Sequence, residues 1–139
     1  MRRFVDTSVF ADVFGEPQPN KQACLALIAA AQCGDVELHA SVEMIQELVF
    51  HRMRRVDRIT AIAQAHDAQE LCVLHPFGLD VLNQALKLTA TTRTGGRDAV
   101  HAATALLAGF DAIVSPERDF GDIPGPRRLD PADALASPC

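Results

Sequence analysis

Four acidic residues lie within or directly after apolar stretches of the sequence, where a carboxylate is unexpected. Asp6 interrupts the apolar, β-branched stretch FVDTSVF near the start of the chain, and a carboxylate beside an apolar core is costly unless it is neutralised or hydrogen-bonded. Asp98 opens the stretch 98–108, which is almost entirely small or apolar and therefore predicts a buried helix. Glu117 and Asp119 come directly after the apolar stretch DAIVS. Carboxylates in such places suit metal binding or acid–base chemistry.

Each acid also has a simpler structural explanation when it is taken alone. Asp6, followed by Thr7 and Ser8, is best explained as the N-cap of a short helix, and Asp98 after Gly95-Gly96-Arg97 has the same explanation. Glu117 and Asp119 can be ordinary turn acids. Glu47 lies on the polar side of its helix together with Glu43, His51 and Arg54. Taken alone, this polar side indicates a solvated face.

Taken together, the acids predict a shared site. An acid after the first strand, one within a helix, one opening a buried helix and a pair after a late strand can meet in one crevice. Carboxylates at such close quarters repel one another and raise each other's pKa. A hard divalent cation relieves that repulsion, and a ligand set of oxygens alone selects Mg²⁺ or Mn²⁺. Sites of this kind commonly clamp a scissile phosphodiester and activate a bound water.

The elements that must position these acids alternate along the chain. Apolar and β-branched runs predict strands at 2–5, 36–40, 71–75, 111–115 and 127–130. Helical spacing, caps and breakers predict helices at 7–14, 20–33, 41–56, 57–70, 79–92 and 98–108. Alternation with short, wholly apolar strands indicates a parallel sheet covered by helices on both faces. Ligands of such sheets bind outside the carboxyl ends of the strands, which is where Asp6 falls.

Two further predictions concern helix faces. In the helix 41–56 the spacing of four apolar residues predicts the buried side, formed by Val42, Ile45, Val49 and Met53. His101 lies three residues after Asp98 on an apolar helix and is interpreted as a packed histidine rather than a metal ligand.

Composition limits the classes of function. With 139 residues the chain is long enough for one domain with a real core. A formal charge of −5 argues against a general polyanion binder, and seven phenylalanines without tryptophan or tyrosine do not suggest an extended base-stacking platform. The cations are unusual in kind, 11 arginines against two lysines, and Arg is the better bidentate phosphate ligand. The sequence therefore allows a local phosphate-facing patch.

Targeting and cysteine patterns add expectations. Asp6 breaks the apolar run after Met1-Arg2-Arg3, so this run does not form the core of a signal peptide, and no stretch approaches a membrane span. We expect a cytoplasmic protein that does not associate with membranes. The four cysteines have no CxxC spacing, so neither a zinc site nor a disulfide framework is indicated.

At this point the sequence resembles the PIN-domain ribonucleases, specifically the VapC-type toxins of bacterial toxin–antitoxin pairs. The resemblance covers residues 1–139 as a single PIN domain, and four stretches carry it: FVDTSVF, SVEMIQELVF, RDAVHAATALLAGFDAIVS and ERDFGDIPG. The third is the most specific. The resemblance implies a three-layer α/β/α fold with a central parallel sheet of four or five strands. It also implies Mg²⁺-dependent cleavage of RNA (Mn²⁺ able to substitute), homodimerisation, and neutralisation by a small VapB-type antitoxin that occupies the site.

The resemblance also assigns site residues. Carried over by position, the catalytic acids are Asp6, Glu47, Asp98 and Asp119, with Asp6 and Asp98 as the first metal ligands and Glu117 as a candidate fourth acid. Hydroxyl groups that would hydrogen-bond these carboxylates belong to Thr7, Ser8 and Ser115. The family usually has Asp where this chain has Glu117 and Thr where it has Ser115. Candidate contacts to RNA phosphates are Arg52, Arg54, Arg55, Arg93 and Arg97, and the alternative for HRMRR is a solvated helix end whose cations suit the dipole.

Two interpretations from other classes compete with the ribonuclease. A catalytically silent PIN fold acting as an RNA-binding or scaffold module has no reason to keep the repulsion among Asp6, Glu47 and Asp98. A phospho-relay receiver or an aspartyl phosphatase also places Asp at a strand end. The phosphatase needs a second Asp at the position of Ser8, and the receiver needs a late strand-end Lys that neither Lys21 nor Lys87 provides.

Overall fold

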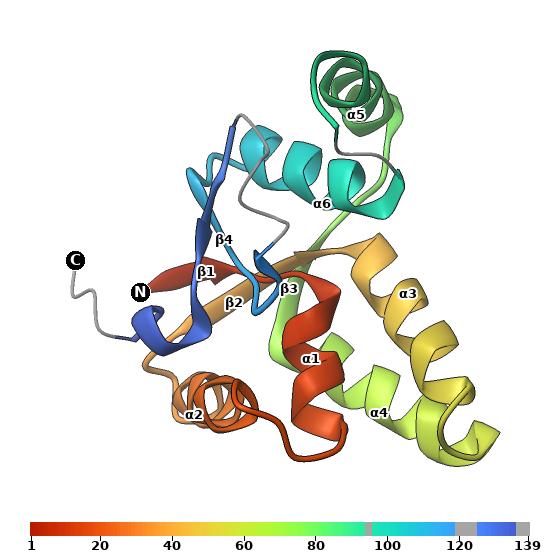
Figure 1. The fold of residues 1–139 in the computed structure, drawn as a ribbon, viewed down its shortest axis with the longest axis vertical. Coiled ribbons are helices and arrows are strands. Elements are labelled where there is room, and N and C mark those ends of the chain that lie inside the picture. The colour runs from red at the N-terminus through yellow and green to blue at the C-terminus, as the bar shows by residue number, and fades with distance from the viewer. Residues whose placement is uncertain (94–95, 119–124, 136–139) are drawn as a thin grey trace.

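Strands and helices alternate along the chain (Figure 1). The computed structural model describes residues 1–93, 96–118 and 125–135. Its strands are β1 (Arg2–Phe4), β2 (Glu37–Ser41), β3 (Cys72–His75), β4 (Ala112–Val114) and β5 (Arg127–Leu129). Its α-helices are α1 (Thr7–Phe14), α2 (Lys21–Gln32), α3 (Val42–Met53), α4 (Arg58–Leu71), α5 (Leu79–Thr91) and α6 (Gly96–Leu107), followed by a 3₁₀ turn at Pro131–Asp133. Within those ranges, none of the helices has the length and apolarity that crossing a membrane requires.

The strands form two parallel sheets rather than one. β2 lies between β1 and β3 in the first sheet, and β4 pairs with β5 in the second. A single parallel bridge between Val5 and Val114 joins them, and the Asp6 amide donates a hydrogen bond to the Val114 carbonyl at 3.2 Å. The predicted central sheet of four or five strands is therefore wrong. Because α1 already begins at Thr7, little extended chain remains after β1 to pair with β4.

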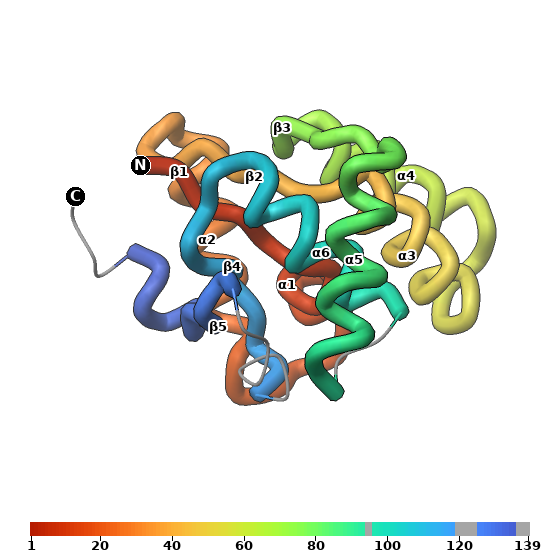
Figure 2. Tube along the Cα trace, turned by 90° about the horizontal axis from the view of Figure 1, so that it is seen from above, coloured from red at the N-terminus to blue at the C-terminus, as the bar shows by residue number. Residues whose placement is uncertain are grey.

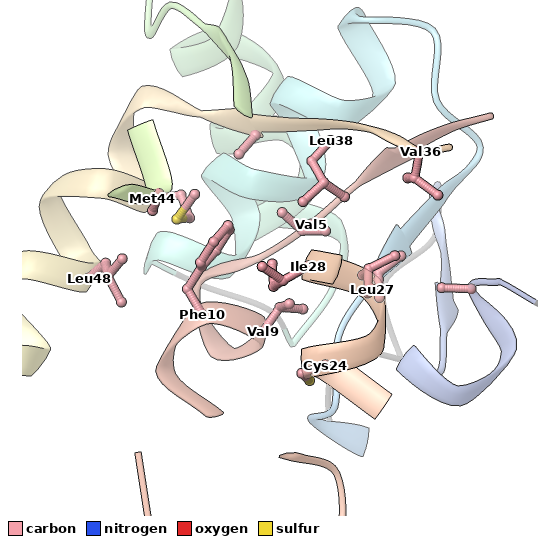
Figure 3. Close-up of a cluster of buried hydrophobic side chains, with 14 of the residues drawn as sticks. Val5, Val9, Phe10, Cys24, Leu27, Ile28, Val36, Leu38, Met44 and Leu48 are labelled. Carbon is pink, nitrogen blue, oxygen red and sulfur yellow. The ribbon is translucent and has the colours of Figure 1, made fainter. Parts of the chain in front are cut away.

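Helices cover both faces of the strands. The side chains of successive residues along a strand point to opposite faces of the sheet. Val5 and Val114 therefore join a core beneath α1, α2, α3 and α4, part of which Figure 3 shows. Phe4 and Ile113 join a second core beneath α5 and α6. Figure 1 shows the same order, with α5 and α6 on one side of the strands and the other helices on the opposite side. The layers match those that the alternation predicts.

The buried side of α3 differs from the predicted one. Met44, Leu48 and Arg52 are buried, whereas Val42 and Met53 are each 37% exposed. Apolar residues lie on almost every side of this helix, so spacing alone does not select a face. The choice is made by α1 and α4, which pack against α3.

The helix α6 owes its position to small residues. Its buried side is almost entirely alanine, and Ala102, Ala103 and Ala105 are each 0% exposed. Side chains this small let α6 lie close to both β2 and α5. In Figures 1 and 2 the axes of α5 and α6 cross where the two helices pack together. Close approach of α6 brings Asp98 and His101 toward the ends of the strands.

Packing around Ala102 gives the first testable prediction. Replacing Ala102 by Leu adds side-chain volume at a fully buried position, so the free energy of unfolding should fall by about 1–3 kcal/mol. Ala63→Leu, at an exposed position of α4, is the matched control and should change stability by less than about 0.5 kcal/mol. Urea denaturation of both variants measures the difference. Equal midpoints would contradict the tight packing of α6.

Candidate active site

Four of the five predicted acids line one cleft. Its volume is about 220 Å³, and its walls come from α1, α3, α6 and the segment that follows β4. Its carboxylates come from four separate parts of the chain: Asp6, Glu47, Asp98 and Glu117. Arrangement at the carboxyl ends of parallel strands explains how residues so far apart in sequence meet.

Asp6 is both a helix cap and a wall of the cleft. Its side chain is the N-cap of α1, and its Oδ1 accepts hydrogen bonds from the Ser8 amide at 3.1 Å and the Ser8 hydroxyl at 2.7 Å. The residue is only 3% exposed. Burial raises its pKa from the ordinary 3.8 to about 6, opposed by hydrogen bonds from Ser8 and Ser115 and by His101, and reinforced by the charge of Asp98. The carboxylate is thus oriented but short of positive charge.

Glu47 does not belong to a solvated face of its helix, as its simpler explanation required. Its Oε1 accepts hydrogen bonds from the Thr7 hydroxyl and from His101 Nε2, the latter at 3.1 Å, while Arg97 Nη1 lies 3.6 Å from Oε2. Burial raises the pKa of this carboxyl, but the hydrogen bonds and the charges of His101 and Arg97 outweigh it, so the pKa lies below its usual value. The pKa of Glu47 is therefore shifted in the opposite direction from that of Asp6.

His101 is the site residue that the sequence interpretation missed. It is a packed histidine, as predicted, with an exposed fraction of 1%. Its Nε2, however, contacts Glu47 and also lies 3.3 Å from the Thr7 hydroxyl, while its buried Nδ1 has no hydrogen-bond partner among the described residues. Its place on the face of Asp98, one turn along an otherwise apolar helix, was the available signal, because a buried ring nitrogen needs a polar partner.

Asp98 and Glu117 complete the described part of the cleft. Asp98 lies within the first turn of α6, which begins at Gly96, so it is not the N-cap that the simpler explanation requires. Glu117 is exposed, and its backbone amide donates to the Ser115 hydroxyl at 3.1 Å. The predicted acid Asp119 lies outside the described residues. Across ranges 1–93, 96–118 and 125–135, no three His, Cys, Asp or Glu side chains lie close enough together to hold a metal ion.

Four of the five predicted phosphate-binding arginines fall into three groups. Arg54 and Arg97 line the cleft itself. Arg55 lines an adjoining hollow of about 600 Å³, which also borders Ser8 and Glu117. Arg93 is exposed just beyond α5.

Arg52 has a structural role. It is 4% exposed, and its guanidinium donates hydrogen bonds to the Gln64 side chain at 2.9 Å and to the Phe14 carbonyl at 3.2 Å. It therefore ties α3 to α4 and α1. The prediction that Arg52 contacts an RNA phosphate stays a prediction: two of its nitrogens bind within the protein, and the residue also lines the hollow of about 600 Å³ beside the cleft.

Comparisons with known proteins agree with this architecture. A family model described as PIN domain matches residues 3–126. The sequence is also similar to a curated protein named Ribonuclease VapC7 from Mycobacterium tuberculosis, at 32% identity over 122 residues, which covers 86% of this chain and 84% of that protein.

Similar solved structures include toxin–antitoxin complexes. A chain of VapBC2 from Rickettsia felis, bound to a promoter DNA fragment, matches with a TM-score of 0.72 at 13% identity and covers 94% of this chain and 98% of its own. A chain of DNA-bound VapBC from Salmonella typhimurium matches with a TM-score of 0.68 at 16% identity, covering 94% and 99%. At such identities the likeness shows the fold alone.

The raised pKa of Asp6 predicts a pH dependence of stability. Because the folded pKa of about 6 exceeds the ordinary 3.8, Asp6 contributes stability below about pH 4 that is lost as the pH rises through 6. In EDTA, the free energy of unfolding of the wild type should therefore fall relative to that of Asp6→Asn by about 2 kcal/mol between about pH 4 and pH 7.5. Asn keeps the capping oxygen, so the difference isolates the charge.

Asp130→Asn provides a control of opposite sign. The pKa of Asp130 is lowered by the backbone hydrogen bond from Ala132 and by Arg128, so its ionised form favours the folded state and its contribution grows as the pH rises. Urea denaturation across the pH range measures both variants. If the free energies of unfolding of the wild type and of Asp6→Asn changed in parallel with pH, the pKa of Asp6 would not be raised in the folded state.

Proposed function

The chain belongs to the PIN-domain family, and from this premise we propose that it is the toxin of a VapBC-type toxin–antitoxin pair, an endoribonuclease that hydrolyses RNA phosphodiester bonds. The observation that carries the proposal is the convergence of Asp6, Glu47, Asp98 and Glu117 in one cleft. No structural need brings four carboxylates from distant segments together, since each raises the cost of ionising its neighbours. A nuclease site does need them.

The donors in the cleft fit a divalent ion, for which we propose Mg²⁺, with Mn²⁺ able to substitute. All four carboxylates offer the oxygen ligands that such ions prefer, and the raised pKa of Asp6 marks a buried carboxylate whose charge its neighbours only partly offset. Asp6 and Asp98 would hold the ion; because no three acids of the described residues lie close enough together to hold one, the set would be completed by Asp119, outside those residues, or by Glu117. When bound, the ion supplies positive charge at the scissile phosphate and lowers the pKa of the attacking water.

The side chains around these acids prepare the site. Ser8 and Ser115 orient the Asp6 carboxylate, and Thr7 and His101 hold Glu47 ionised and fixed in the cleft. Fixing the acids in advance reduces the reorganisation required when the substrate binds.

Arginines would supply the remaining contacts to the substrate. We assign Arg54 and Arg97, at the cleft, and Arg55, beside it, to phosphates flanking the scissile bond, with Arg93 as an outlying contact. This local patch lets a protein with a formal charge of −5 bind RNA. The same function implies a VapB-type antitoxin as partner, a homodimer and a cytoplasmic location.

Cleavage in the presence and absence of divalent ions tests the function. The purified chain should cleave total RNA with Mg²⁺ or Mn²⁺ and lose that activity in EDTA. Asp98→Asn should reduce cleavage at least about 100-fold, because the neutral amide binds the ion weakly and leaves the charge at the scissile phosphate uncompensated. Mg²⁺ should also raise the melting temperature of the wild type more than that of Asp98→Asn, since a ligand stabilises the state that it binds.

Asp80→Asn is the matched control, because Asp80 is also an acid in the first turn of a helix but lies outside the cleft. It should cleave as the wild type does. Cleavage that persists in EDTA would exclude the metal mechanism. Absence of cleavage of every RNA, with a folded protein, would favour a silent binding or scaffold module.

The two acids after β4 are separated by their variants. Pro116 restricts Ser115 to extended geometry and favours a turn, so Glu117 and Asp119 should not be equivalent. We expect Asp119→Ala to lose more activity than Glu117→Gln, and Glu117→Asp to be tolerated or to bind Mg²⁺ more tightly. The Mg²⁺ dependence of RNA cleavage measures all three. An inactive Glu117→Gln beside a normal Asp119→Ala would reverse the assignment.

A further inference from the structure

One exposed aromatic ring stands at the mouth of the cleft. Phe50 lies on α3 one turn after Glu47, and it is 52% exposed although it is a large apolar side chain. Arg54 and Arg97 flank it, with guanidinium carbons 5.9 Å and 5.8 Å from the ring centroid. Contacts at the outer limit of the cation–π range leave the ring open to another partner.

Phe50 lines two hollows. One is the cleft that holds the acids, and the other is a second hollow of about 290 Å³. The residues common to both are Glu47, Phe50 and Arg97. A group bound in the second hollow is thus adjacent to a phosphate bound at the acids.

The second hollow combines apolar walls with hydrogen-bonding groups. Val49, Phe50 and Met53 form the apolar part, while Glu43 and Gln46 contribute a carboxylate and an amide. A flat, apolar group with polar edges has the chemistry that matches both parts. A nucleobase is such a group, because its faces stack on aromatic rings and its edges form hydrogen bonds.

We propose that this second hollow binds an unpaired nucleobase of the RNA substrate, which stacks on Phe50 while Arg97 and Arg54 hold the adjoining phosphates. The inference rests on the proposed function and specifies its substrate, an unpaired nucleotide next to the scissile bond. The low aromatic content of the chain argues against an extended stacking platform, but a subsite of this kind needs only one ring.

A second copy of the chain is the main competing occupant, because Val42 and Met53 are also partly exposed on α3. The centre of a protein–protein interface is normally depleted of charge. Phe50 instead stands between two arginines and beside the carboxylate of Glu47, which is linked to Arg97 at 3.6 Å. Positive charge around an open ring matches a phosphate-bearing base better than a copy of the same surface.

The absence of tryptophan and tyrosine from the chain permits a direct test. Phe50→Trp introduces a single fluorescent ring at the proposed subsite, and Phe77→Trp introduces one at an exposed position outside both hollows as the matched control. Both are made in an Asp98→Asn background to prevent cleavage. The probes are a six-nucleotide single-stranded RNA of mixed sequence and an abasic ribose-phosphate oligomer of the same length.

We expect the RNA, but not the abasic oligomer, to quench the indole emission of the Phe50→Trp protein, and we expect neither to affect the Phe77→Trp protein. Phe50→Ala should weaken RNA binding about tenfold, with Phe50→Trp retaining it, because stacking on an aromatic ring contributes on that order. Phe77→Ala should bind normally. Since Phe50 is half exposed, its truncation should leave the melting temperature nearly unchanged.

Three results would overturn the proposal. Equal quenching by the abasic oligomer would mean that phosphates alone occupy the subsite. Emission that changes with protein concentration in the absence of RNA, together with a Phe50→Ala protein of smaller oligomeric mass, would assign the surface to a second copy. Wild-type cleavage of RNA without any quenching in Phe50→Trp would refute the subsite and leave the ribonuclease intact. Failure of the wild type to cleave would instead count against the proposed function, which the quenching measurement does not require.

Discussion

A buried carboxylate at the end of β1 constrains everything built around it. Asp6 is nearly inaccessible to water, and burial raises its pKa to about 6, so its ionised form is disfavoured unless hydrogen bonds and positive charge offset the burial. Ser8 and Ser115 provide hydrogen bonds but no charge. A divalent ion would provide the charge. The cost of burying Asp6 is in this sense the physical basis of the proposed metal chemistry.

The contrast between Asp6 and Glu47 gives the cleft two kinds of acid. Asp6 is short of positive charge, whereas His101, Thr7 and Arg97 hold Glu47 in its ionised form. Two carboxylates in one cleft therefore have pKa values displaced in opposite directions, because their surroundings differ. Arg97 also reaches Phe50, so one guanidinium links the acids to the proposed base subsite.

Packing places these groups more than local sequence does. Alanines on α6 allow the helix close to the strands, which brings His101 to Glu47 across from α3. The α3 helix is in turn oriented by Leu48 and Met44 in the core and by the hydrogen bonds of Arg52 to α1 and α4. The geometry of the cleft therefore depends on contacts several turns away from it.

The sequence alone determined the features that depend on local chemistry. The order of strands and helices, the Asp6 cap and the alternation that predicts parallel strands all follow from neighbours along the chain. Tertiary structure decided which face of α3 is buried, because apolar residues surround that helix and its partners make the choice. It likewise decided that Arg52 serves the fold, that the strands divide into two sheets and that His101 meets Glu47. These outcomes depend on pairs of residues far apart along the chain, whose proximity no local pattern encodes.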